Sequence, residues 1–328
     1  MHRMVLMLVS CLIMLGYAGC GEKRVTKPAS SRVTLAVIPK GTTHEFWKAV
    51  HAGAAQAAKE LDVDIIWKGA LKEDNREVQI SVVEDFISRR VSGIVLAPLD
   101  DTALCAPVAS AVRNGIPVVI FDSDLKSDQT VSFIATDNYA GGKLAGKYLA
   151  DLLDGKGKVA MLRYQEGSAS TMRREQGFMD AIKYYPGIEV VSANQYGGPT
   201  TETAYQASEN MLAPLKATQG GLIVQGIFCP NESTTFGMLR ALQDASLAGK
   251  VCYVGFDSST KLVEALRAGH IDGLVLQNPM RMGYLSVCTM VTHLRGKAVD
   301  KRIDTGATLA TKENMDQPAI RELLNPKL

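Results

Sequence analysis

The chain has 328 residues, which corresponds to one large or two ordinary domains. Hydrophobic residues make up 46% and charged residues 21%, a balance that excludes intrinsic disorder and a collagen-like repeat. The formal charge is +2, but residues 1–32 hold five Lys and Arg against one Glu, so the remainder (31 basic, 33 acidic) carries −2. That remainder lacks the positive field that drives binding to a phosphate backbone, so nucleic acid is not an expected partner.

The first twenty residues have the pattern of an export signal. Arg3 precedes an apolar stretch over 4–15, which is too short for a spanning helix of roughly 20 residues. No other long apolar run follows, which excludes a polytopic membrane protein. Ala18-Gly19-Cys20 resembles the box of a bacterial lipoprotein, in which the cysteine is lipidated. We therefore expect a signal peptide over 1–19, lipidation at Cys20 and a polar tether over 20–32; the alternative is a plain signal peptide followed by an incidental cysteine.

The cysteines of the remaining chain do not form a recognisable framework. They are widely spaced and include no C-x-x-C pair, so they predict neither a zinc site nor a redox centre. Disulfides are allowed outside the cytosol, but a body of this size needs none. We expect buried free thiols at Cys105, Cys229, Cys252 and Cys288.

From Val33 onward, short β-branched runs alternate with amphipathic helical stretches, and the same series occurs twice. The expected strands are 33–38, 64–67, 93–97, 118–121, 159–162, 188–191, 222–224 and 252–255, and the expected helices are 46–61, 78–90, 102–114, 172–184, 202–215 and 235–244. Each half closes with the same tripeptide, at 121–123 and 256–258. Nearly continuous apolar strands separated by helices are typical of covered parallel sheets. The predicted fold is α/β, with two doubly wound parallel-sheet (Rossmann-like) domains.

Polar side chains follow several of these strands. Ligands of such sheets bind beyond the carboxyl ends of the strands, and Asp122, Asp257 and Asn231 stand there. We therefore expect a polar cleft between the two domains. The alternative for any one of these residues is an ordinary helix cap or turn position.

The motifs of several enzyme classes are absent from the sequence. The glycines of 141–146 lack the spacing of the dinucleotide fingerprint, and no phosphate loop of the G-x-x-x-x-G-K-S/T kind occurs. The five histidines show no metal-ligand spacing, and there is no G-x-S-x-G turn. With an export signal and a cleft between domains, binding is a simpler interpretation than catalysis, and we expect neither a cofactor nor a metal.

From Val33 to the C-terminus the chain resembles the ribose-type periplasmic sugar-binding proteins of ABC importers, within the type I periplasmic binding protein family. The segments that carry the resemblance are 44–47 (HEFW), 116–122 (IPVVIFD), 133–138 (FIATDN), 174–178 (REQGF), 228–232 (FCPNE), 254–257 (VGFD) and 277–279 (QNP). The expected domains are 33–136 plus 278–306 and 137–277 plus 307–328. Three crossings, near Thr136, Gln277 and Gly306, would form a hinge.

The resemblance also implies a set of ligand-binding residues. Phe46 and Trp47 match the aromatic pair that sandwiches the sugar ring, whose apolar C–H faces pack on aromatic faces. The alternative is that both are core residues of the helix. The polar binding residues of the family, which can hydrogen-bond to neighbouring hydroxyls of a sugar, are matched by Asp122, Arg174, Asn231, Asp257 and Gln277. Thr136 matches a position that holds a small hydroxyl side chain. His44 stands where many relatives have Asn.

Two positions depart from the ribose-binding pattern. Ser123 stands where ribose binders usually have an Arg, and Pro199 stands where a second aromatic wall is expected. The ligand left open by these departures is a different pentose, a hexose, a polyol or a sugar-like signal molecule.

Several functions are compatible with this fold. The first is an exported substrate-binding protein of the periplasm or cell envelope, a monomer that meets the membrane only through its lipid anchor and delivers a sugar to an ABC permease. The second is a periplasmic sensor that presents its ligand to a receptor kinase. A repressor core of the lac type would need an N-terminal helix-turn-helix where this chain has an apolar signal, and an exported hydrolase would need catalytic residues that the sequence does not show.

Overall fold

The computed structural model describes residues 32–326 of the chain. The predicted signal peptide, Cys20 and nearly all of the predicted tether therefore lie outside the described residues. Within them, strands and helices alternate to form two six-stranded sheets. The predicted α/β fold with two doubly wound, mainly parallel sheets is confirmed.

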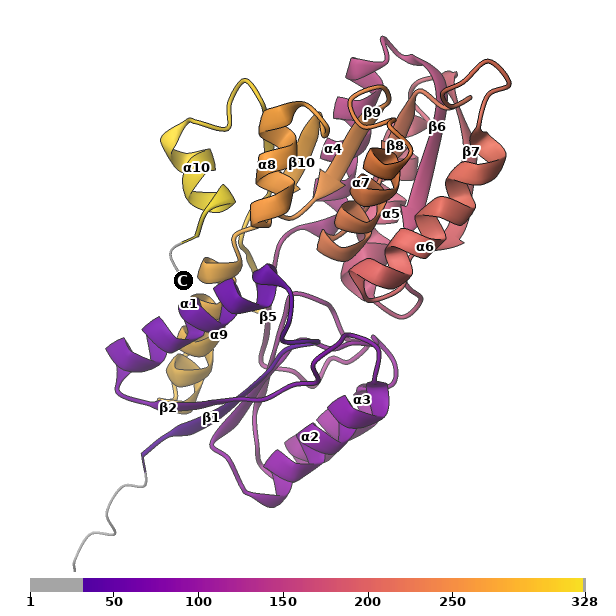
Figure 1. Cartoon of the computed structure of the whole chain (residues 1–328). Coiled ribbons are helices and arrows are strands. Elements are labelled where there is room, and N and C mark those ends of the chain that lie inside the picture. Colours follow the sequence, from indigo (N-terminus) through magenta and orange to yellow (C-terminus); the bar gives the residue numbers. More distant parts are fainter. Residues whose placement is uncertain (1–31, 327–328) are drawn as a thin grey trace, which may run out of the picture. The chain divides into compact units, whose positions relative to one another are not determined.

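The first sheet has the strand order β11-β5-β4-β3-β1-β2, and all of its pairs are parallel. Its strands are β1 (Thr34–Ile38), β2 (Asp64–Trp67), β3 (Gly93–Leu96), β4 (Val118–Phe121), β5 (Ser132–Ala135) and β11 (Arg302–Asp304). Side chains alternate along β1, so Leu35 and Val37 pack with α1 (Glu45–Leu61) and α9 (Pro279–Leu294). Ala36 and Ile38 pack with the helices of the opposite face, α2 (Arg76–Ser88) and α3 (Cys105–Arg113) (Figure 1).

The second sheet has the order β12-β10-β9-β8-β6-β7, in which β12 is antiparallel to β10. Its strands are β6 (Lys156–Arg163), β7 (Gly187–Tyr196), β8 (Gly226–Phe228), β9 (Cys252–Phe256), β10 (Gly273–Leu276) and β12 (Thr308–Thr311). One face is covered by α4 (Asn138–Leu152) and α5 (Ala169–Ile182). The other is covered by α6 (Thr201–Leu212) with the 3-10 turn Ala213–Leu215, α7 (Glu232–Asp244), α8 (Thr260–Ala268) and α10 (Pro318–Leu324) (Figure 1).

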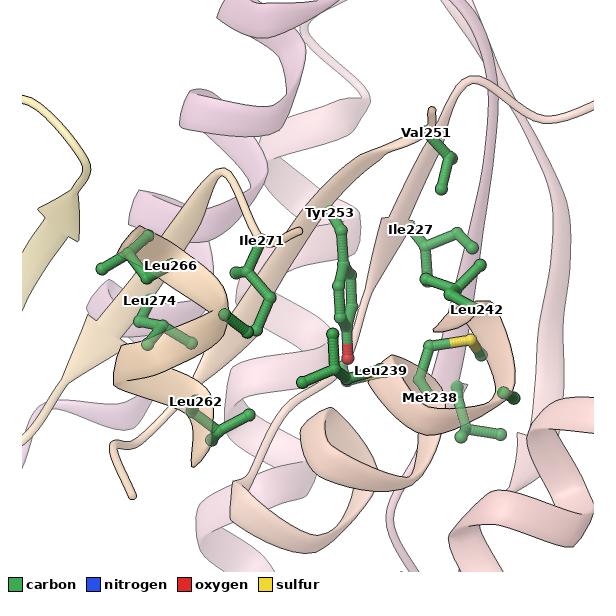
Figure 2. Close-up of a cluster of buried hydrophobic side chains, with 14 of the residues drawn as sticks. Ile227, Met238, Leu239, Leu242, Val251, Tyr253, Leu262, Leu266, Ile271 and Leu274 are labelled. Atoms are coloured by element: carbon green, nitrogen blue, oxygen red, sulfur yellow. The ribbon is translucent and has the colours of Figure 1, made fainter. Parts of the chain in front are cut away.

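The core under α7 and α8 shows how the second sheet is held. Tyr253 of β9 is fully buried between the two helices, with Leu239 of α7 near its hydroxyl end (Figure 2). Its hydroxyl donates a hydrogen bond to the backbone oxygen of Thr235 at 2.7 Å, so the polar end of this large side chain is satisfied. Each buried aliphatic side chain of such a core contributes about 1.5–3 kcal/mol.

One predicted strand is wrong. The apolar run 222–224 is not a strand; β8 lies at Gly226–Phe228, where it pairs with β6 and β9. Ile223 is 40% exposed, whereas Ile227 and Phe228 are fully buried. The run 222–224 instead closes a turn through a bridge between Lys216 and Leu222, which the two glycines before Leu222 make possible.

The chain passes between the two sheets three times, after β5, after β10 and after β11. We call the first sheet with its helices the first lobe and the second sheet with its helices the second lobe. Hydrogen bonds tie the passages together: Thr136 Oγ1 donates to the backbone oxygen of Gly306 at 3.2 Å, and the Asp137 amide donates to Asp304 Oδ1 at 3.0 Å. Three connections between the lobes restrict the motion of one lobe relative to the other to bending and twisting about these passages.

Candidate functional site

Loops at the carboxyl ends of strands from both sheets meet around one small cavity. Its volume is about 30 Å³, enough for roughly two water molecules. Both lobes contribute to its wall. The lining residues are Lys40, His44, Phe46, Trp47, Glu73, Asp122, Tyr164, Ser170, Thr171, Arg174, Asn231, Glu232, Asp257 and Gln277.

Eight of the ten predicted ligand-binding residues line this cavity, although they are far apart in sequence: His44, Phe46, Trp47, Asp122, Arg174, Asn231, Asp257 and Gln277. Ser123 and Thr136 are not among the lining residues. Ser123 is buried and its Oγ accepts a hydrogen bond from the amide of Ser170 in the other lobe at 3.1 Å. Thr136 lies at the first passage between the lobes, where it bonds to Gly306.

Asp122 and Asp257 occupy equivalent places, directly after β4 and β9. Both have left-handed backbone conformations, with φ of 60° and 68°. Such angles are uncommon for residues other than glycine, although Asp and Asn tolerate them better than most. Uncommon backbone conformations cluster at functional sites, and here the repeated tripeptide places one at each side of the cavity.

Lys40, which follows β1, forms a buried ion pair with Asp122. Its Nζ lies 3.0 Å from Asp122 Oδ2, and the two side chains are 3% and 5% exposed. The same ammonium donates to the hydroxyls of Ser168 and Ser170 in the second lobe, at 3.3 and 3.1 Å. Lys40 therefore joins the predicted Asp122 carboxylate to the opposite side of the cavity.

Glu73 receives hydrogen bonds from three directions. Trp47 Nε1 and the Tyr164 hydroxyl each donate to it at 2.6 Å, and His44 Nδ1 lies 2.9 Å from its carboxylate. Burial lowers the pKa of His44, but the charge and hydrogen bond of Glu73, together with the nearby carboxyls of Glu232 and Asp257, outweigh burial and raise that pKa to about 9. Burial raises the pKa of Glu73, but His44 and its other donors outweigh this and lower it to about 2. The two therefore form an ion pair at neutral pH.

Arg174 is held in place by three contacts in the second lobe. Its Nε donates to Asn138 Oδ1 at 2.8 Å, its Nη1 donates to the Pro230 oxygen at 2.9 Å, and its guanidinium lies over the Phe256 ring at 4.0 Å. Close packing of α4 on α5 sets the position of this residue, because a Cβ on Gly142 would overlap the carbonyl oxygen of Arg174. The guanidinium reaches Asp257 Oδ2 at 3.8 Å.

Gln277 carries an unsatisfied acceptor at the cavity. Its Nε2 donates to Asp257 Oδ1 at 2.6 Å, while its Oε1 is the one buried side-chain polar atom in residues 32–326 that has no hydrogen-bond partner. Burial raises the pKa of Asp257, against the positive charge of Arg174, which lowers it. An unpaired buried acceptor is costly, which points to a donor supplied by a ligand.

Asn231 and Glu232 begin α7 at the cavity wall. Asn231 caps the helix, accepting a hydrogen bond on its Oδ1 from the Thr234 amide at 3.3 Å. The Glu232 amide donates to Asp257 Oδ2 at 3.1 Å. Burial raises the pKa of the Glu232 carboxyl to about 7. The capping alternative is thus real for Asn231, which both caps its helix and lines the cavity.

Phe46 and Trp47 combine both roles that the sequence left open. Their ring centroids are 4.9 Å apart at an interplanar angle of 84°, and the residues are only 8% and 2% exposed. They belong to the core cluster under α1 and also line the cavity. As they stand, they form an edge-to-face pair at the cavity wall.

Six of the lining residues were not predicted from the sequence: Lys40, Glu73, Tyr164, Ser170, Thr171 and Glu232. The rule that selected Asp122 and Asp257 would have found some of them. Lys40 follows β1 by two residues, Tyr164 follows β6 directly, and Glu232 follows the predicted Asn231. Glu73 lies in the loop between β2 and α2, and only its three-dimensional contacts bring it to the site.

Among residues 32–326, no group of three or more His, Cys, Asp and Glu side chains is arranged to hold a metal ion. No helix in that range is long and apolar enough to cross a bilayer. Each of the four cysteines there is a free thiol, as expected, but only Cys229 is fully buried. Cys105, Cys252 and Cys288 are partly exposed, so the expected burial is wrong for these three.

Known proteins are similar to this chain in both sequence and fold. Residues 35–298 match the family described as the periplasmic binding protein domain. The ribose import binding protein RbsB of Haemophilus influenzae is 30% identical over 85% of this chain and 91% of its own. The crystal structure of a carbohydrate transporter solute-binding protein from Agrobacterium radiobacter, in complex with D-arabinose, superposes with a TM-score of 0.85 at 33% identity, covering 90% of this chain and 100% of that one. A solute-binding protein of Agrobacterium vitis with bound D-fucose gives a TM-score of 0.83 at 34% identity, covering 89% and 100%.

The fold and the site thus define a two-lobed protein that encloses a small polar ligand between its lobes. The chain belongs to the periplasmic binding protein family, and its relatives are sugar-binding proteins of ABC importers.

Proposed function

We propose that this protein captures a sugar or sugar-like small molecule between its two lobes and delivers it to an ABC importer. The observation that carries the proposal is the unpaired Gln277 Oε1 in a cavity where both lobes present charged and amide groups. A ligand hydroxyl supplies the missing donor. Because several polar groups around the cavity come in fixed donor and acceptor pairs, a molecule with neighbouring hydroxyls matches them better than an apolar one.

The aromatic and polar residues have distinct roles in this proposal. Phe46 and Trp47 pack on the C–H faces of the sugar ring. The hydroxyls of the ligand exchange hydrogen bonds with Asp122, Arg174, Asn231, Asp257 and Gln277, and His44 also contacts the edge of the ligand. Ser123 and Thr136 act at a distance from the ligand, through the contact of Ser123 with Ser170 and through the hinge.

Capture requires the lobes to part and close. A cavity of about 30 Å³ is far below the roughly 300–1,000 Å³ of ordinary ligand pockets, so a sugar enters only when the lobes separate. We propose domains of 33–136 plus 278–306 and 137–277 plus 307–328, joined by the three passages. The closing of such domains around a ligand is a hinge motion.

The cellular setting is part of the proposal. The sequence pattern supports export through a signal peptide over 1–19 and lipidation at Cys20. Membership of the family supports a monomeric state and delivery of the ligand to a permease partner. We propose no enzymatic activity. The sensor alternative is less well supported, because the ribose relative is named as an import binding protein.

A thermal-shift screen tests the proposed ligand class. The protein is melted with D-ribose, D-allose, D-arabinose, D-fucose and a set of polyols, and a ligand at 100 times its dissociation constant stabilises by about 2.7 kcal/mol. We expect at least one of these compounds to raise the melting temperature of the wild type. Gln277→Ala should lose that shift, whereas Gln206→Ala, at an exposed position of α6, should keep it. If no compound shifts the wild type, or if Gln277→Ala keeps the full shift, the proposal is wrong.

A further inference from the structure

Among the described helices, α1, α3, α5, α8 and α10 begin without a capping side chain, and the first amides of two of them, α1 and α8, are met by a carboxylate of the opposite lobe. The residues before α1 and α8 are His44 and Ser259, and neither side chain makes a capping hydrogen bond. By contrast, α2, α4, α6, α7 and α9 are each capped by the side chain that precedes them. The first amides of a helix have no partner within it, so α1 and α8 need acceptors from elsewhere.

Each of these two helices receives a carboxylate from the other lobe. Glu232 Oε1 accepts a hydrogen bond from the Glu45 amide at 3.2 Å, and its Oε2 accepts one from the Phe46 amide at 3.1 Å. In return, Glu45 Oε2 accepts from the Thr260 amide at 3.0 Å and from the Thr260 hydroxyl at 3.4 Å. Glu232 belongs to α7 in the second lobe and caps α1 in the first, while Glu45 belongs to α1 and caps α8.

These contacts exist only while the lobes are together. Separation leaves two helix N-termini without their acceptors and removes the Glu45 carboxylate from the positive end of the α8 dipole. Removing one such cap by substitution typically changes a folding or conformational equilibrium constant by about fivefold. The factors for the two caps multiply. The effect falls on the ratio of closed to open protein, which in turn scales the apparent affinity for a ligand.

We propose that Glu45 and Glu232 form a reciprocal latch between the lobes, which favours the closed arrangement and slows release of the ligand. Glu45 does not line the central cavity, whereas Glu232 does, so Glu45 is the residue whose substitution tests the latch alone. Both are positioning residues for ligand capture. The latch depends on the proposed function in one respect only: it is proposed to retain the ligand that the cavity binds.

Hydrogen–deuterium exchange of the purified full chain tests the latch without any sugar, so its failure is separate from failure of the ligand proposal. Two amides report on lobe separation at places remote from residue 45. The Asp101 amide donates to the Gly167 oxygen of the second lobe at 2.9 Å, and the Ser170 amide donates to Ser123 Oγ of the first lobe at 3.1 Å. Glu45→Ala should speed exchange at both amides by roughly fivefold, because all contacts between the lobes open together.

Controls separate the latch from a local cap. Glu202→Ala removes another acidic first-turn residue, at α6, whose carboxylate pairs with Arg240 of its own lobe, and should leave both reporters unchanged. Glu45→Gln keeps an acceptor oxygen and should restore much of the wild-type exchange rate. If Glu45→Ala speeds exchange only around Thr260, or nowhere, the latch does not exist and Glu45 is merely a cap of α8.

Discussion

The buried pair of Lys40 and Asp122 gives the sharpest test of how this site is held together. Removing either partner leaves the other charge buried and incompletely paired, at 3% or 5% exposure. Lys40→Met should destabilise the protein by about 3–5 kcal/mol. Asp122→Asn should cost less, about 2–3 kcal/mol, because the amide oxygen still accepts from Lys40 and Asn tolerates the left-handed backbone.

The double variant distinguishes a true pair from two independent effects. With both charges removed, no unpaired charge remains, so the loss should fall short of the sum of the single losses by about 2 kcal/mol. Urea unfolding followed by circular dichroism, without sugar, measures all four proteins. The same cycle on the exposed Lys261–Glu264 pair, 65% and 60% exposed, should give a coupling below about 0.5 kcal/mol. Additive losses at Lys40 and Asp122 would refute the argument that the pair stabilises the site.

Three further predictions concern single residues. The pKa of His44 is raised from 6.5 to about 9, so the folded protein holds this proton more tightly than the unfolded chain does. The free energy of unfolding should therefore fall as the pH rises from 6.5 to 9. In urea melts at several pH values, His44→Gln should remove the part of this fall that His44 causes. Trp47→Phe keeps a ring but removes the donor 2.6 Å from Glu73, so it should cost about 1.5–3 kcal/mol in the same assay. Cys20→Ser should move the protein from the membrane fraction to the soluble fraction; a wild type that is already soluble would contradict lipidation.

The sequence predicted the fold class because its strands are buried on both faces. Runs such as Val118–Phe121 are fully buried, so composition alone marked them as strands. The same rule failed at 222–224, where an equally apolar run precedes the true strand by two residues. Only the parallel register with β6 decides which run enters the sheet, and register depends on contacts far along the chain.

The candidate site was predicted unevenly for a similar reason. Asp122 and Asp257 follow strands within a repeated tripeptide, so their position was visible in the sequence. Lys40 and Glu232 also stand shortly after strands, so the same rule could have selected them. Glu73 could not be selected in this way, because it lies in a loop and only its contacts with distant residues such as Tyr164 bring it to the site.

The charge pairing at the cavity also bears on the ligand. The three cations there each face a carboxylate: Asp122 pairs with Lys40, Glu73 with His44 and Asp257 with Arg174. The fourth carboxyl, Glu232, accepts from the first amides of α1, and burial raises its pKa to about 7, which favours its neutral form. A neutral sugar or polyol can exchange hydrogen bonds with these groups and leave every charge paired. A charged ligand would add a charge that has no counterpart in the cavity once the lobes close.

We therefore expect a neutral ligand to bind far more tightly than its charged analogues. Leaving one charge unpaired in a closed site costs several kcal/mol, which corresponds to at least about a hundredfold in the dissociation constant. Calorimetry would compare the neutral sugar that gives the largest thermal shift with its 2-amino derivative and its C6 carboxylate. The Lys40→Met variant provides a matched check, because it leaves Asp122 without its cation and should reduce the discrimination against the amino sugar. A carboxylate or amino derivative that binds the wild type as tightly as the neutral sugar would show that the pairs rearrange freely, and the charge argument would fail.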